Sequence, residues 1–491
     1  MQLDMLVSQL NTRTVSGSTD VEVTALSYDS RRIDEGSVFF ALRGDEVDGH
    51  GFVPAAIEAG ARAVVAEEEA PSGDNGDVTW VQVEDSRTAL ADGAKAFWGD
   101  PSADVAVAGI TGTNGKTTTA FLLQHLLRAT WGRCGLLGTV YYDTGLERRV
   151  AERTTAEASD NQKMLSEMRD AGCRGAVMEV SSHGLVQERV RGIEFKAGLF
   201  TNLSQDHLDY HGDMESYFQA KRLLFEQMAS QPSVQSTATM AVNHDDAYGR
   251  RLLREFEGTL EAVSFGMGLG ADFRAIDPRS DVNGTTFKLE AKGRSFLVRL
   301  PHVGRHNVFN ALAALAGGSA MGINLRESVS HLGEAPQVPG RLESVVDRKP
   351  YKIFVDYAHT PDALENVLGT LRDLSPRRII TVFGCGGDRD RAKRPLMGQA
   401  VERLSDVAVV TSDNPRTEVP SRIIEDTLKG MSLGTAVVIE DRREAIEEAI
   451  GLAGPRDIVL LAGKGHEAYQ EVGRERHPFD DVKIARAVAE R

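Results

Sequence analysis

The stretch Gly112-Thr113-Asn114-Gly115-Lys116-Thr117-Thr118-Thr119 decides how the central part of this chain folds. It follows the apolar segment 105–108, which predicts a buried strand, and it precedes residues 118–129, where apolar side chains recur at helical spacing. A strand, a glycine-rich turn and a helix N-terminus form a cradle for phosphate, because backbone N–H groups point at the anion and the helix dipole favours its charge. In such a cradle Lys116 reaches the terminal phosphates and Thr117 holds Mg²⁺.

This loop departs from the general P-loop pattern at one position. The pattern has a glycine five places before its second glycine, and here that position holds Ile110. The alternative to a phosphate site is a glycine-rich turn with a surface lysine. Because strand, glycine, lysine and hydroxyl occur in the expected order, the sequence favours a site for a nucleoside triphosphate.

Length and composition bound the class of protein. A chain of 491 residues is too long for one core and predicts roughly three domains. A net charge of −16 without a block of lysine and arginine disfavours nucleic-acid binding. The N-terminus lacks the features of a signal peptide, and no apolar run approaches the roughly 20 residues that span a bilayer. The three scattered cysteines, Cys134, Cys173 and Cys385, are typical of a reduced compartment, so we expect a cytoplasmic protein without membrane insertion.

The order of predicted elements indicates an α/β protein with three domains. Residues 1–100 carry short strands and two helices, which predicts a small α/β domain. Residues 101–335 alternate strands and helices, which predicts a parallel sheet, with an antiparallel insertion over 258–300. Residues 336–491 resume the alternation and predict a doubly wound, Rossmann-like domain.

Several polar residues in the central domain are candidates for chemistry. Glu179 ends the predicted strand 176–180 and His207 lies in a loop, so that with Thr117 they suit a divalent cation beside phosphates. The alternative for His207 is a loop histidine that bonds its neighbours. Lys221 lies on a predicted helix, where a solvated lysine is the plain alternative. Asn307 and Asn310 are three residues apart on a helical face, and they either read a base edge or cap the helix.

Four predicted strands of the last domain end in glycine or charge. The strands 353–356, 379–383, 407–411 and 458–461 are followed by D-Y-A-H-T-P, G-C-G-G-D-R-D, D-N-P-R and G-K-G-H-E. Ligands bind at the carboxyl ends of strands in such sheets, so four polar ends on one edge predict a ligand crevice.

Taken together, these motifs resemble the Mur ligase family, whose members join amino acids to the nucleotide-linked precursor of peptidoglycan. The similarity covers essentially the whole chain, because G-T-N-G-K-T-T, M-E-V-S-S-H-G-L, D-H-L-D-Y-H-G, Y-F-Q-A-K, H-N-V-F-N and D-Y-A-H-T-P-D occur in family order. The match is closest to members that extend UDP-N-acetylmuramoyl-L-alanyl-D-glutamate. Among these, D-N-P-R marks the kind that adds meso-diaminopimelate, and relatives that add lysine lack its arginine.

The resemblance implies a role for each matching position. ATP phosphates would be held by Gly112, Thr113, Asn114, Gly115, Lys116, Thr117 and Thr118, and adenosine by Asn307, Asn310, Arg341 and Asp356. Two Mg²⁺ ions would be held by Thr117, Glu179, His207 and Lys221, the last as a carbamate, and Lys116, Lys221 and His207 would form the catalytic set. The UDP-peptide would contact Thr154, Thr155, Ser181, Gln187 and Arg189, and its uridine and sugar would lie near Tyr28, Ser30, Asp45, Glu46 and Val47. Arg153 stands where the family often has asparagine. Diaminopimelate would contact Arg389, Asp413, Asn414, Pro415, Arg416, Gly463 and Glu467.

The implied activity is an ATP-dependent amide ligation by a monomer, in which the first domain holds UDP, the second ATP and the third the amino acid. Three alternatives remain: a lysine-adding relative, a folylpolyglutamate synthetase, which should lack D-N-P-R together with G-K-G-H-E, and a P-loop switch that hydrolyses ATP without an amino acid.

Overall fold

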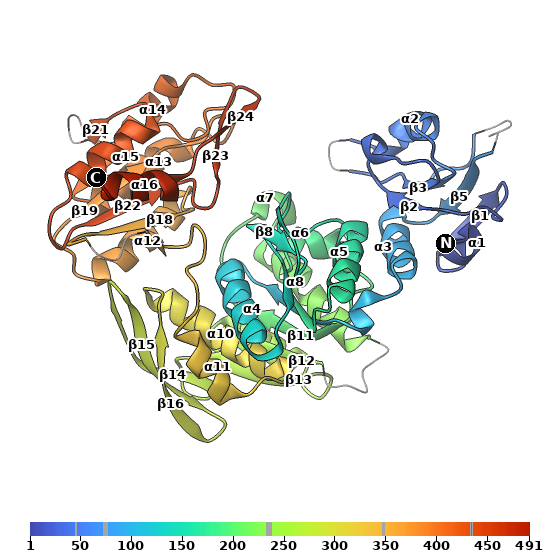
Figure 1. Ribbon diagram of the computed structural model, residues 1–491, viewed down its shortest axis with the longest axis horizontal. Helices are drawn as coiled ribbons and strands as arrows, with labels where there is room; N and C mark the ends of the chain where they lie inside the picture. The colour runs from blue at the N-terminus through green and yellow to red at the C-terminus, as the bar shows by residue number, and fades with distance from the viewer. Residues whose placement is uncertain (45–46, 72–76, 232–237, 346–348, 433, 435) are drawn as a thin grey trace. The chain divides into compact units, whose positions relative to one another are not determined.

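The computed structural model describes residues 1–44, 47–71, 77–231, 238–345, 349–432, 434 and 436–491 (Figure 1). The predicted uridine contacts Asp45 and Glu46 therefore lie outside the described residues. Its internal contacts group the chain into two units, Met1–Arg274 with Leu312–Ser328, and Ala275–Ala311 with Val329–Arg491. No helix in these described ranges is long and apolar enough to cross a membrane.

The first sheet of unit 1 is a five-stranded sheet in the order β1-β5-β4-β3-β2, in which only β1 runs antiparallel to its neighbour. Its elements are α1 (Leu3–Val7), β1 (Thr12–Ser16), β2 (Ala25–Ser27), η1 (Ser30–Arg32), β3 (Ser37–Phe40), η2 (Gly49–Phe52), α2 (Val53–Glu58), β4 (Ala63–Ala66), β5 (Thr79–Val83) and α3 (Ser86–Phe97). The strand β3 is buried on both faces and so divides two apolar clusters, with Val38 and Phe40 in one and Phe39 in the other. The α/β character predicted for this region is confirmed.

The second sheet of unit 1 has a parallel centre in the order β13-β12-β11-β6-β10-β7, and β8 and β9 extend it antiparallel beyond β7. Its elements are η3 (Pro101–Ala103), β6 (Ala106–Thr111), α4 (Lys116–Trp131), β7 (Cys134–Leu137), β8 (Tyr141–Asp143), β9 (Arg148–Val150), α5 (Ala158–Asp170), β10 (Gly175–Glu179), α6 (Ser182–Val186), β11 (Phe195–Phe200), α7 (Leu208–His211), α8 (Met214–Ala229), β12 (Thr239–Asn243), α9 (Ala247–Glu255) and β13 (Glu261–Gly266). The strand, loop and helix predicted around Gly112 are β6, residues 112–115 and α4.

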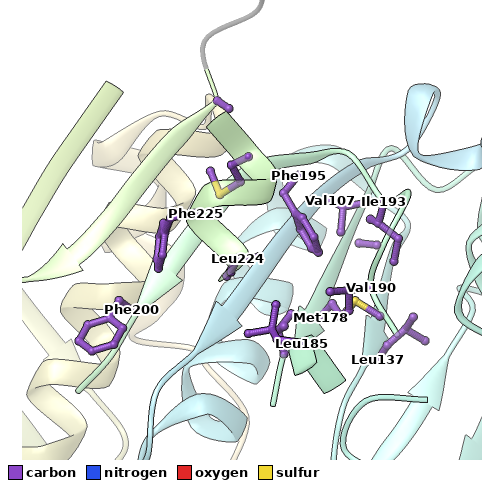
Figure 2. Close-up of a cluster of buried hydrophobic side chains, with 14 of the residues drawn as sticks. Val107, Leu137, Met178, Leu185, Val190, Ile193, Phe195, Phe200, Leu224 and Phe225 are labelled. Atoms are coloured by element: carbon purple, nitrogen blue, oxygen red, sulfur yellow. The ribbon is translucent and has the colours of Figure 1, made fainter. Parts of the chain in front are cut away.

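The core beside this second sheet is aliphatic and aromatic. Figure 2 shows Phe195 and Phe200 of β11 and Leu224 and Phe225 of α8, all of them buried in one cluster. A Cβ on Gly109 of β6 would lie 2.8 Å from the ring of Phe195 on β11 and 3.3 Å from Leu224 of α8, so the small residue leaves room for both side chains over the centre of the sheet. This packing fixes α8, and with it every side chain that α8 carries toward the loop after β6.

The boundary between the units passes through β14 (Phe273–Asp281), α10 (Arg305–Met321) and α11 (Leu325–Leu332). The predicted antiparallel insertion over 258–300 is correct only in its second part. The strands β15 (Gly284–Ala291) and β16 (Arg294–Leu300) pair antiparallel, with turns at 282–283 and 292–293. The strand β13, however, belongs to the parallel sheet and pairs with β12 from Thr239↔Glu261 to Asn243↔Phe265. It lacks the strict alternation that marks the hairpin, because both its neighbours are parallel strands.

The sheet of unit 2 has the order β17-β18-β22-β19-β20-β21, with β17 alone antiparallel, so the doubly wound fold is confirmed. Its elements are β17 (Glu343–Ser344), β18 (Lys352–Asp356), α12 (Pro361–Asp373), β19 (Ile379–Phe383), α13 (Lys393–Leu404), β20 (Val407–Val410), α14 (Pro420–Leu428), β21 (Ala436–Val438), α15 (Arg442–Gly451), β22 (Ile458–Ala462), β23 (Tyr469–Val472), β24 (Glu475–Pro478) and α16 (Asp481–Ala489). Successive residues of β18 enter opposite cores, Ile353 and Val355 one and Phe354 the other. Both faces of the sheet are therefore covered, so a ligand can bind only at the ends of the strands.

Candidate functional site

The loop after β6 has the geometry of a phosphate cradle. Gly112 has φ +143° and Gly115 has φ +85°, and helix α4 begins at Lys116. A Cβ on Gly112 would lie 1.9 Å from Oγ1 of Thr201, so only glycine fits there. The loop is tied to the end of β11, because Asn114 N–H donates to Oδ1 of Asn202 (2.9 Å) and Thr201 Oγ1 donates to the carbonyl of Asn114 (2.7 Å).

Two lysines converge on this loop. Lys116 Nζ donates to the carbonyl oxygens of Gly112 and Thr113, each over 2.9 Å, and Lys221 Nζ donates to the same Gly112 oxygen over 2.9 Å. Lys221 is 1% exposed, so the alternative of a solvated helix lysine is wrong. Burial lowers the pKa of Lys221 well below its usual value, and the charge of Lys116 lowers it further.

Glu179, at the end of β10, is a buried carboxylate held by hydroxyl groups. Its Oε2 accepts from Thr117 Oγ1 (2.9 Å) and from Thr139 Oγ1 (3.1 Å), and its Oε1 accepts from the backbone N–H of Thr139 (2.8 Å). A Cβ on Gly138 would lie 2.3 Å from Glu179 Oε1, so the chain before Thr139 must be glycine. A carboxylate and a hydroxyl in contact at a phosphate cradle are the oxygen donors that Mg²⁺ prefers, and they fit the predicted metal site.

His207 lies in the loop before α7, in left-handed conformation with φ +52°. Its ring is 6.2 Å from that of Tyr217, whose hydroxyl is 3.4 Å from Oγ1 of Thr113 in the loop after β6. The imidazole is half-exposed, with Nε2 3.6 Å from Asp206. His207 is thus near the cradle, and its role as a metal ligand stays a prediction.

The residues predicted to bind the UDP-peptide form a continuous network beside Glu179. Thr155 Oγ1 lies 3.0 Å from the carbonyl oxygen of Glu179 and 3.1 Å from Ser181 Oγ, and Arg189 donates to the carbonyl of Thr155 (3.1 Å). Arg189 also donates to Gln187 Oε1 (2.6 Å) and lies 2.9 Å from Glu157. The hydroxyls of Thr154 and Thr139 are 3.2 Å apart, which joins this network to the metal-site residues.

In the first sheet, the predicted nucleotide contacts are only partly placed. Tyr28 donates its hydroxyl to Asp160 Oδ2 on α5 over 2.7 Å, and burial, followed by the charge of Asp160, raises the pKa of Tyr28. Ser30 is the first residue of η1, and Val47 is exposed. Their contact with a nucleotide stays a prediction.

The predicted adenosine contacts all belong to unit 2. Asn307 and Asn310 lie on one face of α10, since Asn310 Nδ2 donates to Asn307 Oδ1 over 2.9 Å. Neither asparagine caps the helix, because Asn307 is already its third residue and donates to the carbonyl of Val303 (2.8 Å). Asp356 is buried and accepts from the backbone N–H groups of Leu342 and Ala358, and the guanidinium of Arg341 lies 5.2 Å from the ring of Tyr357.

The four polar strand ends of unit 2 meet at one cavity, with a volume of about 640 Å³. Its wall includes Arg389, Asp413, Asn414, Arg416, Gly463 and Glu467, six of the seven residues predicted to hold the amino acid. The seventh, Pro415, is buried between two of them. These loops therefore line one cavity, as predicted, and the ligand that it holds stays a prediction.

Arg416 is held rigidly in the wall of this cavity. Its Nε lies 3.1 Å from Glu471 Oε2, and its Nη1 donates to the carbonyl of Gly387 over 2.7 Å. The backbone of Arg416, at φ +51°, bonds the hairpin β23–β24 through its N–H to Glu471 (3.0 Å) and through its carbonyl to Gly473 (2.7 Å). Sequence reasoning missed Thr139, Lys464, Glu471 and this hairpin. Thr139 had a signal, since Gly138-Thr139 follows a strand as the other site motifs do.

Comparisons with known proteins agree with this geometry. Family models match at residues 22–98 (Mur ligase family, catalytic domain), 110–318 (Mur ligase middle domain) and 340–465 (Mur ligase, glutamate ligase domain). A UDP-N-acetylmuramoyl-L-alanyl-D-glutamate--2,6-diaminopimelate ligase of Geobacillus kaustophilus is 44% identical and covers 99% of each chain. A solved structure with that same ligase name is 34% identical, with a TM-score of 0.69 and 95% of each chain covered. A MurF ligase from Thermotoga maritima in complex with ADP, at 20% identity and a TM-score of 0.61 over 95% of this chain and 96% of that one, shares the fold.

Proposed function

Because the chain belongs to the Mur ligase family, we propose that it is an ATP-dependent ligase that adds meso-2,6-diaminopimelate to UDP-N-acetylmuramoyl-L-alanyl-D-glutamate in peptidoglycan synthesis. The relatives that carry this name match over nearly the whole chain, including the cavity of unit 2. The observation that carries the proposal is Arg416, a fixed guanidinium on the wall of that cavity, where the far carboxylate of diaminopimelate needs a cation.

The reaction has two steps. The γ-carboxylate of D-glutamate attacks the γ-phosphorus of ATP, the bond to the bridging oxygen breaks, and ADP leaves from an acyl phosphate. The amine of diaminopimelate then attacks the acyl carbon, loses a proton and expels phosphate, which leaves an amide. Lys116 meets the charge on the transferred phosphoryl group, and the backbone N–H groups of the loop orient it.

Mg²⁺ would be held by Glu179 and Thr117, with His207 and Lys221 as further proposed ligands. Once bound, such an ion neutralises phosphate charge and polarises the phosphoryl oxygens. Thr139 orients Glu179 through two hydrogen bonds, and Thr155, Ser181 and Arg189 position the peptide substrate next to it.

Lys221 would act as a carbamate rather than as a cation. A neutral amine adds to CO₂, a C–N bond forms and a proton leaves, so the side chain changes from a cation to a carboxylate-like anion. The buried position of Lys221 beside Lys116 supports this, because both burial and the second cation favour the neutral amine that the addition requires.

The remaining parts of the proposal concern organisation. We assign residues 1–100 to the UDP-sugar, 101–335 to ATP and 336–491 to the amino acid, with Asn307, Asn310, Arg341 and Asp356 near adenosine. We also propose that the protein is a monomer and that it works in the cytoplasm; three cysteines that are all buried and free support the second part.

A panel of co-substrates tests the function. ADP release is measured with the UDP-dipeptide and with meso-diaminopimelate, L-lysine or no amino acid, and separately with a folate and glutamate. We expect release only with the UDP-dipeptide together with diaminopimelate, and none from Lys116→Ala. Release without an amino acid would instead indicate an ATPase switch, and release with a folate would indicate a folylpolyglutamate synthetase.

A further inference from the structure

Lys464 is a buried cation directly behind the cavity of unit 2. It has no exposed surface, and it follows β22 in the loop that also carries Glu467. Its Nζ donates to Asn414 Oδ1 over 2.9 Å and lies 3.6 Å from Glu467 Oε2 and 3.8 Å from Asp413 Oδ1. These three partners line the cavity and Lys464 does not, so the ammonium acts on a ligand only through them.

The contacts of Lys464 settle which way the Asn414 amide faces. Asn414 Oδ1 accepts from two donors, Lys464 Nζ and the backbone N–H of Glu471 (3.0 Å), so this atom must be oxygen. Asn414 Nδ2 donates one hydrogen to Glu467 Oε2 over 2.8 Å. Within the part of the chain that the structure describes, no group accepts the second hydrogen of Asn414 Nδ2, and Glu467 Oε1 accepts from the hydroxyl of Tyr357 over 3.5 Å.

The charges around Lys464 leave the inner wall one negative charge in excess. Two cations, Lys464 and Arg442, face three carboxylates, those of Asp413, Glu467 and Asp481. Arg442 is committed to Asp481 by two hydrogen bonds of 2.9 and 2.5 Å, so Lys464 is the partner of Asp413 and Glu467. The rings of Tyr357 and Tyr469 complete the surroundings, the latter 5.7 Å from Lys464 Nζ. The cavity is also lined by Arg416, which is paired with Glu471, and by Arg389, Lys393, Arg394 and Arg476.

We propose that Lys464 is a positioning residue of the amino-acid site, which keeps Asp413 and Glu467 ionised side by side so that the inner wall binds an ammonium group of the amino acid. Asp413 is buried and Glu467 is partly buried. Without a cation between them, two such carboxylates repel each other, and one of them takes up a proton. The lost charge is the one that attracts the ammonium. This inference rests on the proposed function, in which an amino acid occupies the cavity.

The test is the pH dependence of the KM for meso-diaminopimelate, measured as the ratio of variant to wild type from about pH 6 to about pH 9, so that titration of the amino acid itself cancels. Lys464→Met should raise this KM by at least about 30-fold near neutral pH, and the ratio should fall as pH rises and the shared proton leaves. The effect on kcat should be smaller than that on KM. Lys483→Met, which removes an exposed lysine of α16, is the matched control.

Two further variants separate charge from structure. Lys464→Gln keeps an N–H donor for Asn414 but removes the charge, so its KM ratio should depend on pH in the same way as that of Lys464→Met. It keeps the test valid if the methionine variant folds poorly. Asp413→Asn combined with Lys464→Met leaves Glu467 without a competing carboxylate, so the pH dependence of the ratio should vanish. A KM ratio that is unchanged, or raised equally at every pH, would overturn the role of Lys464. If the wild type prefers another amino acid, the proposed function fails, and the same titration with that amino acid still decides the role of Lys464.

Discussion

Lys221 donates a hydrogen bond to the carbonyl oxygen of Gly112, across 109 residues of sequence, and the atoms are 2.9 Å apart. The same oxygen accepts from Lys116, so two lysines share one acceptor inside the phosphate loop. Two positive charges that lie close together in a buried place repel each other. This repulsion disfavours the charged form of Lys221, the more buried of the two lysines. The chemistry of the loop therefore depends on whether Lys221 is a cation, a neutral amine or a carbamate.

Lys221→Ala should be nearly inactive, and short-chain carboxylic acids should restore part of the activity by replacing the carbamate. Lys221→Arg should also fail, because a guanidinium does not form a carbamate. The measurement is ADP release with all co-substrates, and Lys163→Ala, an exposed lysine of α5, serves as the control. Full activity of the arginine variant would show that only a positive charge is needed there.

Thr139→Val should raise the Mg²⁺ concentration needed for half-maximal activity by about 10- to 100-fold, as for other residues that orient a metal ligand. The substitution removes the hydroxyl that donates to Glu179 Oε2 and keeps both the shape and the backbone N–H. Thr139→Ser retains the hydroxyl and should behave like the wild type. If the valine variant has normal Mg²⁺ dependence, Glu179 is not a metal ligand that Thr139 orients.

Sequence alone predicts the parts of the site that are determined by a local pattern of residues. The loop after β6 and the four strand ends of unit 2 each combine an apolar strand with a following glycine or charge, and a parallel sheet brings such ends together by its topology. Lys221 also had a local signal that the first interpretation did not use. It is four residues after Tyr217 and three before Leu224, both buried, which places it on the buried face of α8.

Other features depend on contacts between distant segments. The pairing of Arg416 with Glu471 spans 55 residues, and no residue of β23 or β24 is buried, so no apolar alternation marks these strands. The burial of Lys464 has the same origin, since its partner Asn414 is 50 residues away. The assignment of β13 to an antiparallel insertion failed because its parallel neighbours, not its own residues, set its direction.

The unfolding free energy should fall as pH is lowered from about 6.5 to about 4, and His302 should account for part of the loss. Burial lowers the pKa of His302 to about 4, so the unfolded chain takes up a proton at higher pH than the folded chain does, and stability falls with pH through that window. His302 is 3% exposed, and the full difference corresponds to about 3 kcal/mol.

Urea unfolding curves across this pH range check the expectation. His302→Leu should flatten the dependence without abolishing it, because burial also lowers the pKa of His211 and His466 to about 4. The control is His477→Asn, which removes an exposed histidine from β24. If the unfolding free energy of His302→Leu depends on pH as steeply as that of the wild type, His302 does not contribute to the loss of stability.

Arg416 should select diaminopimelate over lysine. Diaminopimelate has a carboxylate at the far end of its side chain, where lysine has only an ammonium. Glu471 occupies Nε of Arg416 and the carbonyl of Gly387 occupies one hydrogen of Nη1. Among the described residues nothing bonds Nη2, so a terminal edge of the guanidinium is available to a carboxylate in the cavity. If lysine binds instead, the guanidinium of Arg416 repels the lysine ammonium and is left without a carboxylate partner.

The selection is measured as kcat/KM for both amino acids in the wild type and in Arg416→Ala. We expect the value for diaminopimelate to fall by about 30-fold or more, because breaking a partly desolvated charge pair costs about 2–5 kcal/mol, and the value for lysine to stay level or rise. Glu471→Gln keeps an acceptor for Nε but removes its charge, so it should weaken the positioning of Arg416 and raise the KM for diaminopimelate less than Arg416→Ala does. Arg422→Ala, an exposed arginine of α14, should change neither value. If the alanine variant at Arg416 keeps full discrimination, selection lies elsewhere in the cavity, whose wall also carries the guanidinium groups of Arg389, Arg394 and Arg476.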